Sequence, residues 1–473
     1  MFKEKKLILL LLALVTAIVI TGCSGDTSIV ELTKDVDGPS QVIVGEESDE
    51  FTVTGKTGST YYWEVKELSG ENLGYFTNQT GSKTRFVAST EALEKDTIEI
   101  RALISNEPQE WIEIEVLGSK HENKFYKGGF HSIVATKDSS LTSNYKGYLA
   151  GGYIKDVGDL EPSPYIVKAD NRGLMIHEKE YEGDGRFYDI EDIVLTGVGD
   201  RYYVIGYRRL NRDYFEPYIA KLNKKFEKVE QYTYPKPIYG DSFLKGAIGI
   251  EENVSMGITH IVAAGSYQIE SGAVVPYLAK VNVETNEMET KIIPGIDGSY
   301  SSLSAIAETS QGYLAVGESD YAGTNRAFII SLDSELTQTG IVDIEDSQRL
   351  HQIKKVGDNR FVVVGEDGYV GIVDSKGSIL TKLNIDSNLS FRDILVDNGD
   401  IILVGQDRSS QEGVVYKVDE STNNATLLGS YGNYLHAITK STDGYYLLAG
   451  TSIDFYNYVV KIDPDTGQLV DRQ

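Results

Sequence analysis

One pattern recurs seven times in the last three quarters of the chain: a short apolar strand that ends in glycine. It first appears at residues 147–152 and last at residues 446–450. The closing glycines are Gly152, Gly206, Gly265, Gly317, Gly365, Gly405 and Gly450, with spacings of 54, 59, 52, 48, 40 and 45 residues. A period of about 40–60 residues marks a repeat architecture whose single units cannot bury both of their faces.

Each copy is followed by a second apolar strand that ends in Asp or Asn. These residues are Asp170, Asn223, Asn282, Asp333, Asp374, Asp419 and Asp463. We expect the Asp and Asn side chains to form turns, with calcium ligation, for example by Asp463 and Asp465, as the alternative. We expect the glycines to let the chain bend where units crowd together.

A strand before and a weaker strand after complete each unit, and four strands of this length predict one propeller blade. The sequence therefore predicts an all-β chain with a seven-bladed β-propeller at residues 126–473; six or eight blades are the alternatives. Units one and seven, from about Phe130 to about Val470, look complete, so no exchanged strand is expected to close the ring. The units resemble kelch-like and delta-60-type propeller repeats of bacterial surface proteins, which implies a fold but almost nothing about function.

The N-terminus has the pattern of an export signal. Lys3, Lys5 and Lys6 precede an apolar run at residues 7–20, which is short for a membrane span, and small residues follow. Residues 20–23, ending in Cys23, resemble the bacterial lipobox. The resemblance implies a signal peptide at 1–22, acyl chains such as palmitate on Cys23, a lipidated tether at 23–27 and a location on the extracytoplasmic face of the cell membrane. An uncleaved N-terminal anchor is the alternative.

Residues 28–118 alternate apolar and polar side chains in about seven short runs, which predicts an antiparallel β-sandwich. The strands around Trp63 and Phe86 resemble bacterial Ig-like and PKD-like modules, and we expect Trp63 in the core. Such a module is typically a spacer, although it could also bind a glycan or a protein.

The composition limits the classes of partner that the chain is expected to bind. The net charge is -26, and removing residues 1–22, with three lysines against Glu4, leaves -28 (-26 minus +2). This charge disfavours nucleic acid and anionic membrane surfaces, although it could simply maintain solubility. The single cysteine excludes a disulfide framework and a cysteine-rich zinc site.

No P-loop, GxSxG, HExxH or EF-hand motif occurs, and we predict no catalytic residue and no cofactor. The first strand of each unit begins apolar–polar–x–apolar. We expect the polar positions to lie at one mouth of the central channel, because first strands commonly lie nearest the axis. These positions are His131, Glu191, Lys245, Ser304, His351, Arg392 and His436. They could line a water-filled channel, hold a metal, or bind a carboxylate or sugar acid, and Lys245 and Arg392 disfavour a cation.

These features favour a membrane-anchored, non-catalytic binding or scaffolding module for proteins or glycans. One alternative is a carbohydrate-active lyase or hydrolase with its site at the channel mouth, for which paired carboxylates or a metal-held histidine cluster would be required. The other is an assembly factor for envelope protein complexes.

Overall fold

The structure is a computed structural model. It describes residues 36–44, 47–54, 58–66, 73–89, 97–118, 122–136, 147–155, 162–181, 187–196, 201–209, 214–223, 225–232, 240–250, 258–294, 296, 299–321, 324–419, 423–432 and 434–471. The predicted signal peptide, Cys23 and the tether lie outside these residues. The described residues form strands and turns and contain no helix, which confirms the all-β prediction for them. A search of the same residues finds no apolar helix of membrane-spanning length.

The N-terminal part forms three small sheets that share one core. Its strands are β1 (Val36–Asp37), β2 (Gln41–Ile43), β3 (Phe51–Val53), β4 (Tyr61–Val65), β5 (Gly74–Phe76), β6 (Lys83–Thr84), β7 (Phe86–Ala88), β8 (Thr97–Ile104), β9 (Glu107–Pro108) and β10 (Ile112–Leu117). The sheet orders are β1-β3-β6, β2-β10-β8-β4 with β9 beside β8, and β5-β7. Trp63 is fully buried with Phe51 and Phe86, as expected, and its indole N–H donates to the Gly81 carbonyl oxygen at 2.8 Å.

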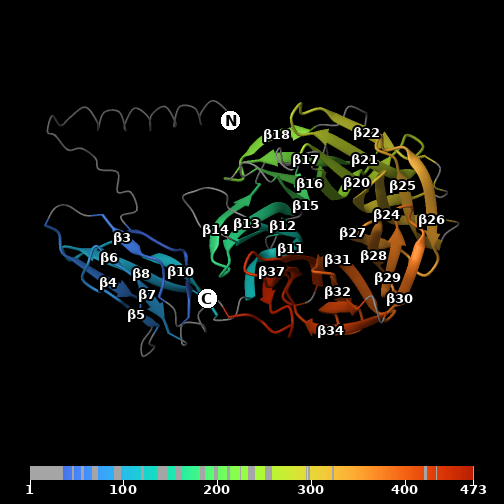
Figure 1. Ribbon diagram of the computed structural model, residues 1–473. Coiled ribbons are helices and arrows are strands. Elements are labelled where there is room, and N and C mark those ends of the chain that lie inside the picture. Colours follow the sequence, from blue (N-terminus) through green and yellow to red (C-terminus); the bar gives the residue numbers. More distant parts are fainter. Residues whose placement is uncertain are drawn as a thin grey trace, which may run out of the picture.

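The rest of the chain forms antiparallel sheets that follow one another around a ring (Figure 1). Five sheets have four consecutive strands each. They comprise β15 (Phe187–Thr196), β16 (Arg201–Arg209), β17 (Phe215–Leu222) and β18 (Lys228–Tyr232); β19 (Phe243–Ile250), β20 (His260–Gln268), β21 (Val274–Asn282) and β22 (Met288–Ile292); β23 (Ser301–Thr309), β24 (Gly312–Tyr321), β25 (Thr324–Leu332) and β26 (Gln338–Ile344); β27 (Leu350–Gly357), β28 (Arg360–Gly365), β29 (Tyr369–Asp374) and β30 (Ile379–Asn384); β31 (Leu389–Asp397), β32 (Asp400–Asp407), β33 (Glu412–Asp419) and β34 (Asn424–Ser430).

A seven-stranded sheet joins the first and last repeats in the order β14-β13-β12-β11-β37-β36-β35. Its strands are β11 (Glu122–Thr136), β12 (Gly147–Ile154), β13 (Ser163–Asp170), β14 (Met175–Glu180), β35 (Tyr434–Lys440), β36 (Tyr446–Thr451) and β37 (Tyr456–Ile462). The first strands of successive repeats contact one another in chain order, and β35 contacts β11, so these strands surround the axis of the ring.

The expectation that no strand is exchanged is wrong. The start of β11 pairs with β37, with Glu122 opposite Val460, whereas its end pairs with β12, with Ile133 opposite Ala150. Within the described residues the last repeat has three long strands of its own, and after its final turn Leu469 forms an isolated bridge with Ile462. The segment before the first repeat therefore covers an edge of β37 that would otherwise be unpaired.

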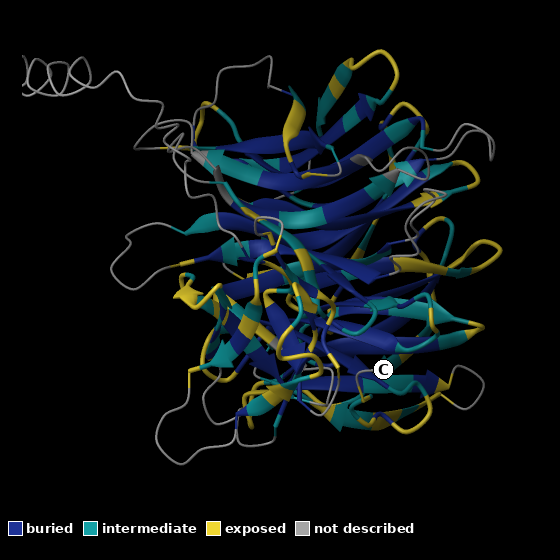
Figure 2. Cartoon of the chain, turned by 90° about the vertical axis from the view of Figure 1, so that its left-hand side faces the viewer, coloured by how far each residue is buried: buried dark blue, intermediate teal, exposed yellow. Residues whose placement is uncertain are grey.

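Apolar side chains on both faces of the strands fill the spaces between neighbouring sheets. Leu278 and Phe328, from adjacent sheets, belong to one such core, and Val363 and Leu350 belong to the next. Figure 2 shows this as dark blue strands with exposed turns at their ends. The strands are therefore nearly continuous apolar runs, as expected for strands covered on both faces.

Six of the seven Asp and Asn residues after the second strands accept hydrogen bonds within turns, as predicted, and residues 420–422, which follow Asp419, lie outside the described part of the chain. The Asp374 Oδ1 atom accepts hydrogen bonds from the backbone N–H groups of Lys376 and Ser378, both at 2.9 Å. Asp333 and Asn223 make equivalent pairs of bonds. These carboxylate and amide oxygens thus satisfy backbone donors within tight turns.

Candidate functional site at the centre of the ring

A β-bulge occurs at the same place in the first strand of all seven repeats. In β11, Phe130 pairs with Gly152 and Ser132 pairs with Gly151, so His131 is the extra residue. The extra residues of the seven bulges are His131, Glu191, Lys245, Ser304, His351, Arg392 and His436. These are the seven polar positions predicted from the sequence. A bulge changes the direction of the side chain of its extra residue. Each repeat therefore directs one polar side chain away from the regular pattern of its first strand.

The closing glycines are required by these bulges. A Cβ atom on Gly405 would lie 2.0 Å from the Ser390 carbonyl oxygen, in the first strand of the same repeat. At the other six glycines, an added Cβ atom would also lie close to a backbone carbonyl oxygen in or just before the first strand of the same repeat. These distances are 2.0 Å for Gly152, 2.2 Å for Gly206, 1.9 Å for Gly265, 2.0 Å for Gly317, 2.1 Å for Gly365 and 1.8 Å for Gly450. The glycines thus permit close approach of two strands, rather than the bending that we expected of them.

All seven bulge side chains line one cavity of about 690 Å³ at the centre of the ring. The structure therefore brings together every member of the predicted set, including Glu191 and Lys245, whose repeats are the longest. Sequence reasoning missed Arg349 and Tyr434, which line the same cavity and lie two residues before a bulge residue. It also missed Glu318 and Glu366, which directly follow a closing glycine and contact the lining residues.

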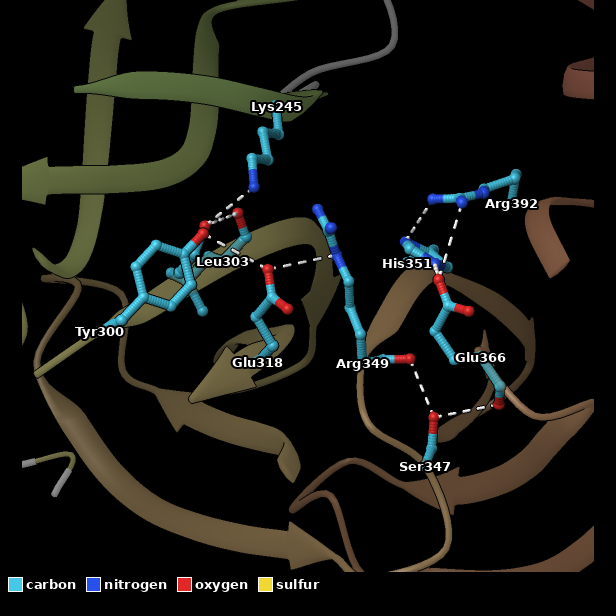
Figure 3. Close-up of polar contacts among 10 residues, drawn as sticks. Lys245, Tyr300, Leu303, Glu318, Ser347, Arg349, His351, Glu366 and Arg392 are labelled. Atoms are coloured by element: carbon cyan, nitrogen blue, oxygen red, sulfur yellow. Dashed lines mark hydrogen bonds and ion pairs between the residues drawn. The ribbon is translucent and has the colours of Figure 1, made fainter. Parts of the chain in front are cut away.

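Lys245 and Arg349 both line the cavity and lie near Tyr300 and Glu318 (Figure 3). The Lys245 ammonium donates to the Ser302 hydroxyl at 3.1 Å, and the Arg349 Nε atom lies 3.4 Å from a carboxylate oxygen of Glu318. The Tyr300 hydroxyl donates to the same oxygen at 3.4 Å. Burial lowers the pKa of Lys245 to about 8, and the positive charge of Arg349 acts in the same direction.

Arg392 belongs to a second network (Figure 3). The His351 Nε2 atom lies 2.8 Å from a Glu366 oxygen, and the Arg392 Nη1 atom lies 3.3 Å from His351 Nδ1. Glu366 also forms ion pairs with Arg392, at 3.6 Å, and with Arg408. Burial, followed by the charges of Arg392 and Arg349, lowers the pKa of His351 well below its usual value. His351 is therefore neutral, donating from Nε2 to Glu366 and accepting at Nδ1 from Arg392.

His131 and His436 adjoin across the junction of the first and last repeats, with ring centroids 5.0 Å apart. Burial lowers the pKa of His131. The negative charge of Asp189, 3.3 Å away, the hydrogen bond to Asp189 and the charge of Glu191 together outweigh burial and raise this pKa to about 9. Burial and the charge of His131 lower the pKa of His436 well below its usual value. The pair thus holds one charged and one neutral imidazole near neutral pH.

Two aspartates, the buried Asp393 and the half-buried Asp192, connect first strands next to the bulges. Asp393 Oδ1 accepts from the Gln352 side-chain amide at 3.1 Å and from its own neighbour Ile394, while Oδ2 accepts from the Ile438 N–H at 3.0 Å. Asp192 links β11, β15 and β19 in the same way, through the Ser132 hydroxyl and the Ala247 N–H. Because each carboxylate ties three repeats together, the wall of the cavity is held in a fixed shape.

Within the described part of the chain, no group of three or more His, Cys, Asp or Glu side chains is arranged to hold a metal ion. The arrangement is instead one of half-buried cations, one charged and two neutral imidazoles, and paired carboxylates around a preformed cavity, which suits recognition of a polar ligand.

No family model matches this chain, and no curated protein matches its sequence. Among solved structures, the WD40 β-propeller domain of Doa1 aligns with a TM-score of 0.48 and 11% identity, over 72% of this chain and 96% of that domain. The computationally designed Ika8 protein gives 0.41 and 11%, over 73% of this chain and 100% of its own. A puromycin-hydrolyzing peptidase of Mycobacterium tuberculosis gives 0.44 and 9%, over 74% of this chain and 56% of its own. Likenesses of this size carry no argument about activity.

Proposed function

We propose that the chain is a lipid-anchored binding module: an Ig-like sandwich followed by a seven-bladed β-propeller, carried on the extracytoplasmic face of the cell membrane by acyl chains on Cys23. Its ligand, a glycan or a segment of a protein, binds at the central cavity. The observation that carries the proposal is the repeated bulge, which directs seven side chains from seven repeats into one space. The volume of this cavity lies within the range of known ligand sites, about 300–1,000 Å³.

The pairing of the carboxylates supports binding over catalysis. Glu318 faces Arg349, Glu366 faces His351 and two arginines, and Asp189 faces His131. A carboxylate paired with a basic side chain is held in one orientation, which suits a fixed recognition surface better than proton transfer.

The binding test uses the full chain in detergent, applied to an array of cell-wall and surface glycans and to extracted envelope proteins. Arg392→Gln combined with His436→Ala removes two bulge side chains that lie on adjacent first strands, β31 and β35. We expect a ligand of the wild type to be lost in this variant and kept in Lys382→Gln, which changes a lysine on the outer strand β30. Equal binding by all three chains would place the ligand elsewhere, and turnover of the ligand would favour the lyase or hydrolase alternative.

The anchor is tested separately. We expect the wild type to fractionate with membranes and to partition into detergent, and Cys23→Ala to appear in the aqueous phase after export, because two or more acyl chains are needed for stable attachment. A Cys23→Ala chain that stays in the membrane would refute acylation at this residue and favour an uncleaved N-terminal anchor.

A further inference from the structure

We propose that the ligand of the central cavity presents two or more negative groups, carboxylate or phosphate, which bridge Lys245, Arg349 and Arg392. This inference rests on the proposed function of the cavity and adds the chemical class of its ligand. Figure 3 shows the three side chains coming from β19, from the residue before β27 and from β31.

The charge of the cavity wall is opposite to that of the chain. The chain has 45 Lys and Arg against 71 Asp and Glu. The residues that line the cavity include five Lys and Arg but only three Asp and Glu, namely Glu191, Asp192 and Asp393. Asp192 and Asp393 have both oxygens engaged by hydrogen-bond donors of the first strands. Positive charge is therefore concentrated on the lining of the central cavity of an acidic protein, which draws anions to it.

The donors around the cavity have unused capacity. An ammonium group carries three N–H donors, and within the described residues the Lys245 ammonium makes one hydrogen bond, to Ser302. The Ser304 hydroxyl, at the bulge of the neighbouring repeat, is buried on the cavity wall, and no hydrogen-bond partner for it is found in the described structure. A buried hydroxyl without a partner is costly, and a ligand oxygen in the cavity would supply the missing bond.

The cations also repel one another. Arg349 and Arg392 both lower the pKa of Lys245, after burial, and Arg349 lowers that of Arg392, which burial brings to about 10. The two guanidinium groups match the paired oxygens of carboxylate and phosphate, and Lys245 supplies a point charge. An anion among them relieves both the repulsion and the loss of solvation, so the arrangement is preorganised for a negative ligand.

Titration calorimetry of the full chain in detergent, at constant ionic strength, tests this inference with citrate as the carboxylate probe, pyrophosphate as the phosphate probe and glucose as the neutral control. We expect at least one anion to bind and glucose not to bind. Lys245→Gln and Arg349→Gln should each weaken binding by about tenfold to a hundredfold, the range for a hydrogen bond to a charged group.

Glu191→Gln should strengthen binding, because it removes a negative charge from the same wall. Lys382→Gln makes the same change of net charge as Lys245→Gln on an outer strand and should leave affinity unchanged. Misfolding cannot produce opposite effects at Glu191 and Lys245. Failure of both anions to bind, or equal losses in Lys382→Gln and Lys245→Gln, would overturn the inference. If a neutral glycan or a protein still binds at the cavity in that case, the proposed function stands.

Discussion

Replacing one closing glycine tests whether the bulges shape the ring. In Gly405→Ala the new methyl group would lie 2.0 Å from the Ser390 carbonyl oxygen, a distance about 1 Å shorter than any that Cβ atoms tolerate. The obstructing atom is backbone, so β31 must move away from β32. Overpacking of this kind costs about 1–3 kcal/mol, and each weakened backbone hydrogen bond adds about 1 kcal/mol. We therefore expect a loss of about 3 kcal/mol in the free energy of unfolding.

Gly357→Ala is the matched control, because a Cβ atom at Gly357, at the end of β27, meets no atom within 4 Å. It should be neutral or stabilise by up to about 1 kcal/mol through reduced freedom of the unfolded chain.

The assay can separate the two parts of the protein. The chain has two tryptophans, Trp63 and Trp111, and both precede the ring, so tryptophan fluorescence follows the N-terminal sheets. Far-ultraviolet circular dichroism is dominated by the ring. We expect Gly405→Ala to lower the transition seen by dichroism by a few degrees and to leave the fluorescence transition in place. Equal dichroism transitions for Gly405→Ala and Gly357→Ala would refute the steric explanation of the repeated glycine.

Three further outcomes follow from the described contacts. Asp393→Ala leaves the Ile438 N–H and the Gln352 amide without their acceptor, so we expect urea denaturation to show a loss of about 3 kcal/mol, and a loss below about 1 kcal/mol would contradict the role of this residue in joining repeats. The pKa of His131 is raised to about 9 in the folded chain, so the stability that this group contributes is complete below its unfolded pKa of about 6.5 and is lost as the pH rises toward 9. Thermal unfolding between pH 6 and 9.5 should show this decline in the wild type and a weaker one in Asp189→Asn; parallel curves would count against the ion pair. Deletion of residues 122–127 should expose the edge of β37, and we expect a lower transition temperature and self-association by light scattering, whereas a stable monomer would show that β11 is dispensable for closure.

The sequence repeat was enough to predict the ring of sheets, but it did not predict how the first and last repeats join. Apolar strands ending in glycine and followed by Asp or Asn recur often enough to identify the sheets, because each strand is buried on both faces. Residues 122–127, by contrast, are mostly polar and straddle the predicted start of the propeller at residue 126, so the sequence pattern did not mark them as a strand. This segment pairs with β37 because the closed ring brings the two ends of the repeat array together. The periodicity of apolar residues along the sequence contains no information on that contact.

The residues of the cavity could likewise be predicted only in part. A single polar residue among apolar neighbours identified all seven bulge positions, but the reason for the glycine opposite them appears only when two strands are seen together. Arg349, Glu318 and Glu366 were missed although each holds a constant offset from a bulge residue or a closing glycine. Alignment of the repeats at those offsets is the signal that could have found them.

The position of β11 has a mechanical consequence. β10 ends at Leu117 and β11 begins at Glu122, so a pull transmitted along the chain from the N-terminal side reaches the ring at the strand that joins its two ends. Such a force acts along a strand that is bonded to β37 near its start and to β12 near its end. How long the protein withstands tension is then governed by the rate at which this one strand detaches, a kinetic property distinct from equilibrium stability.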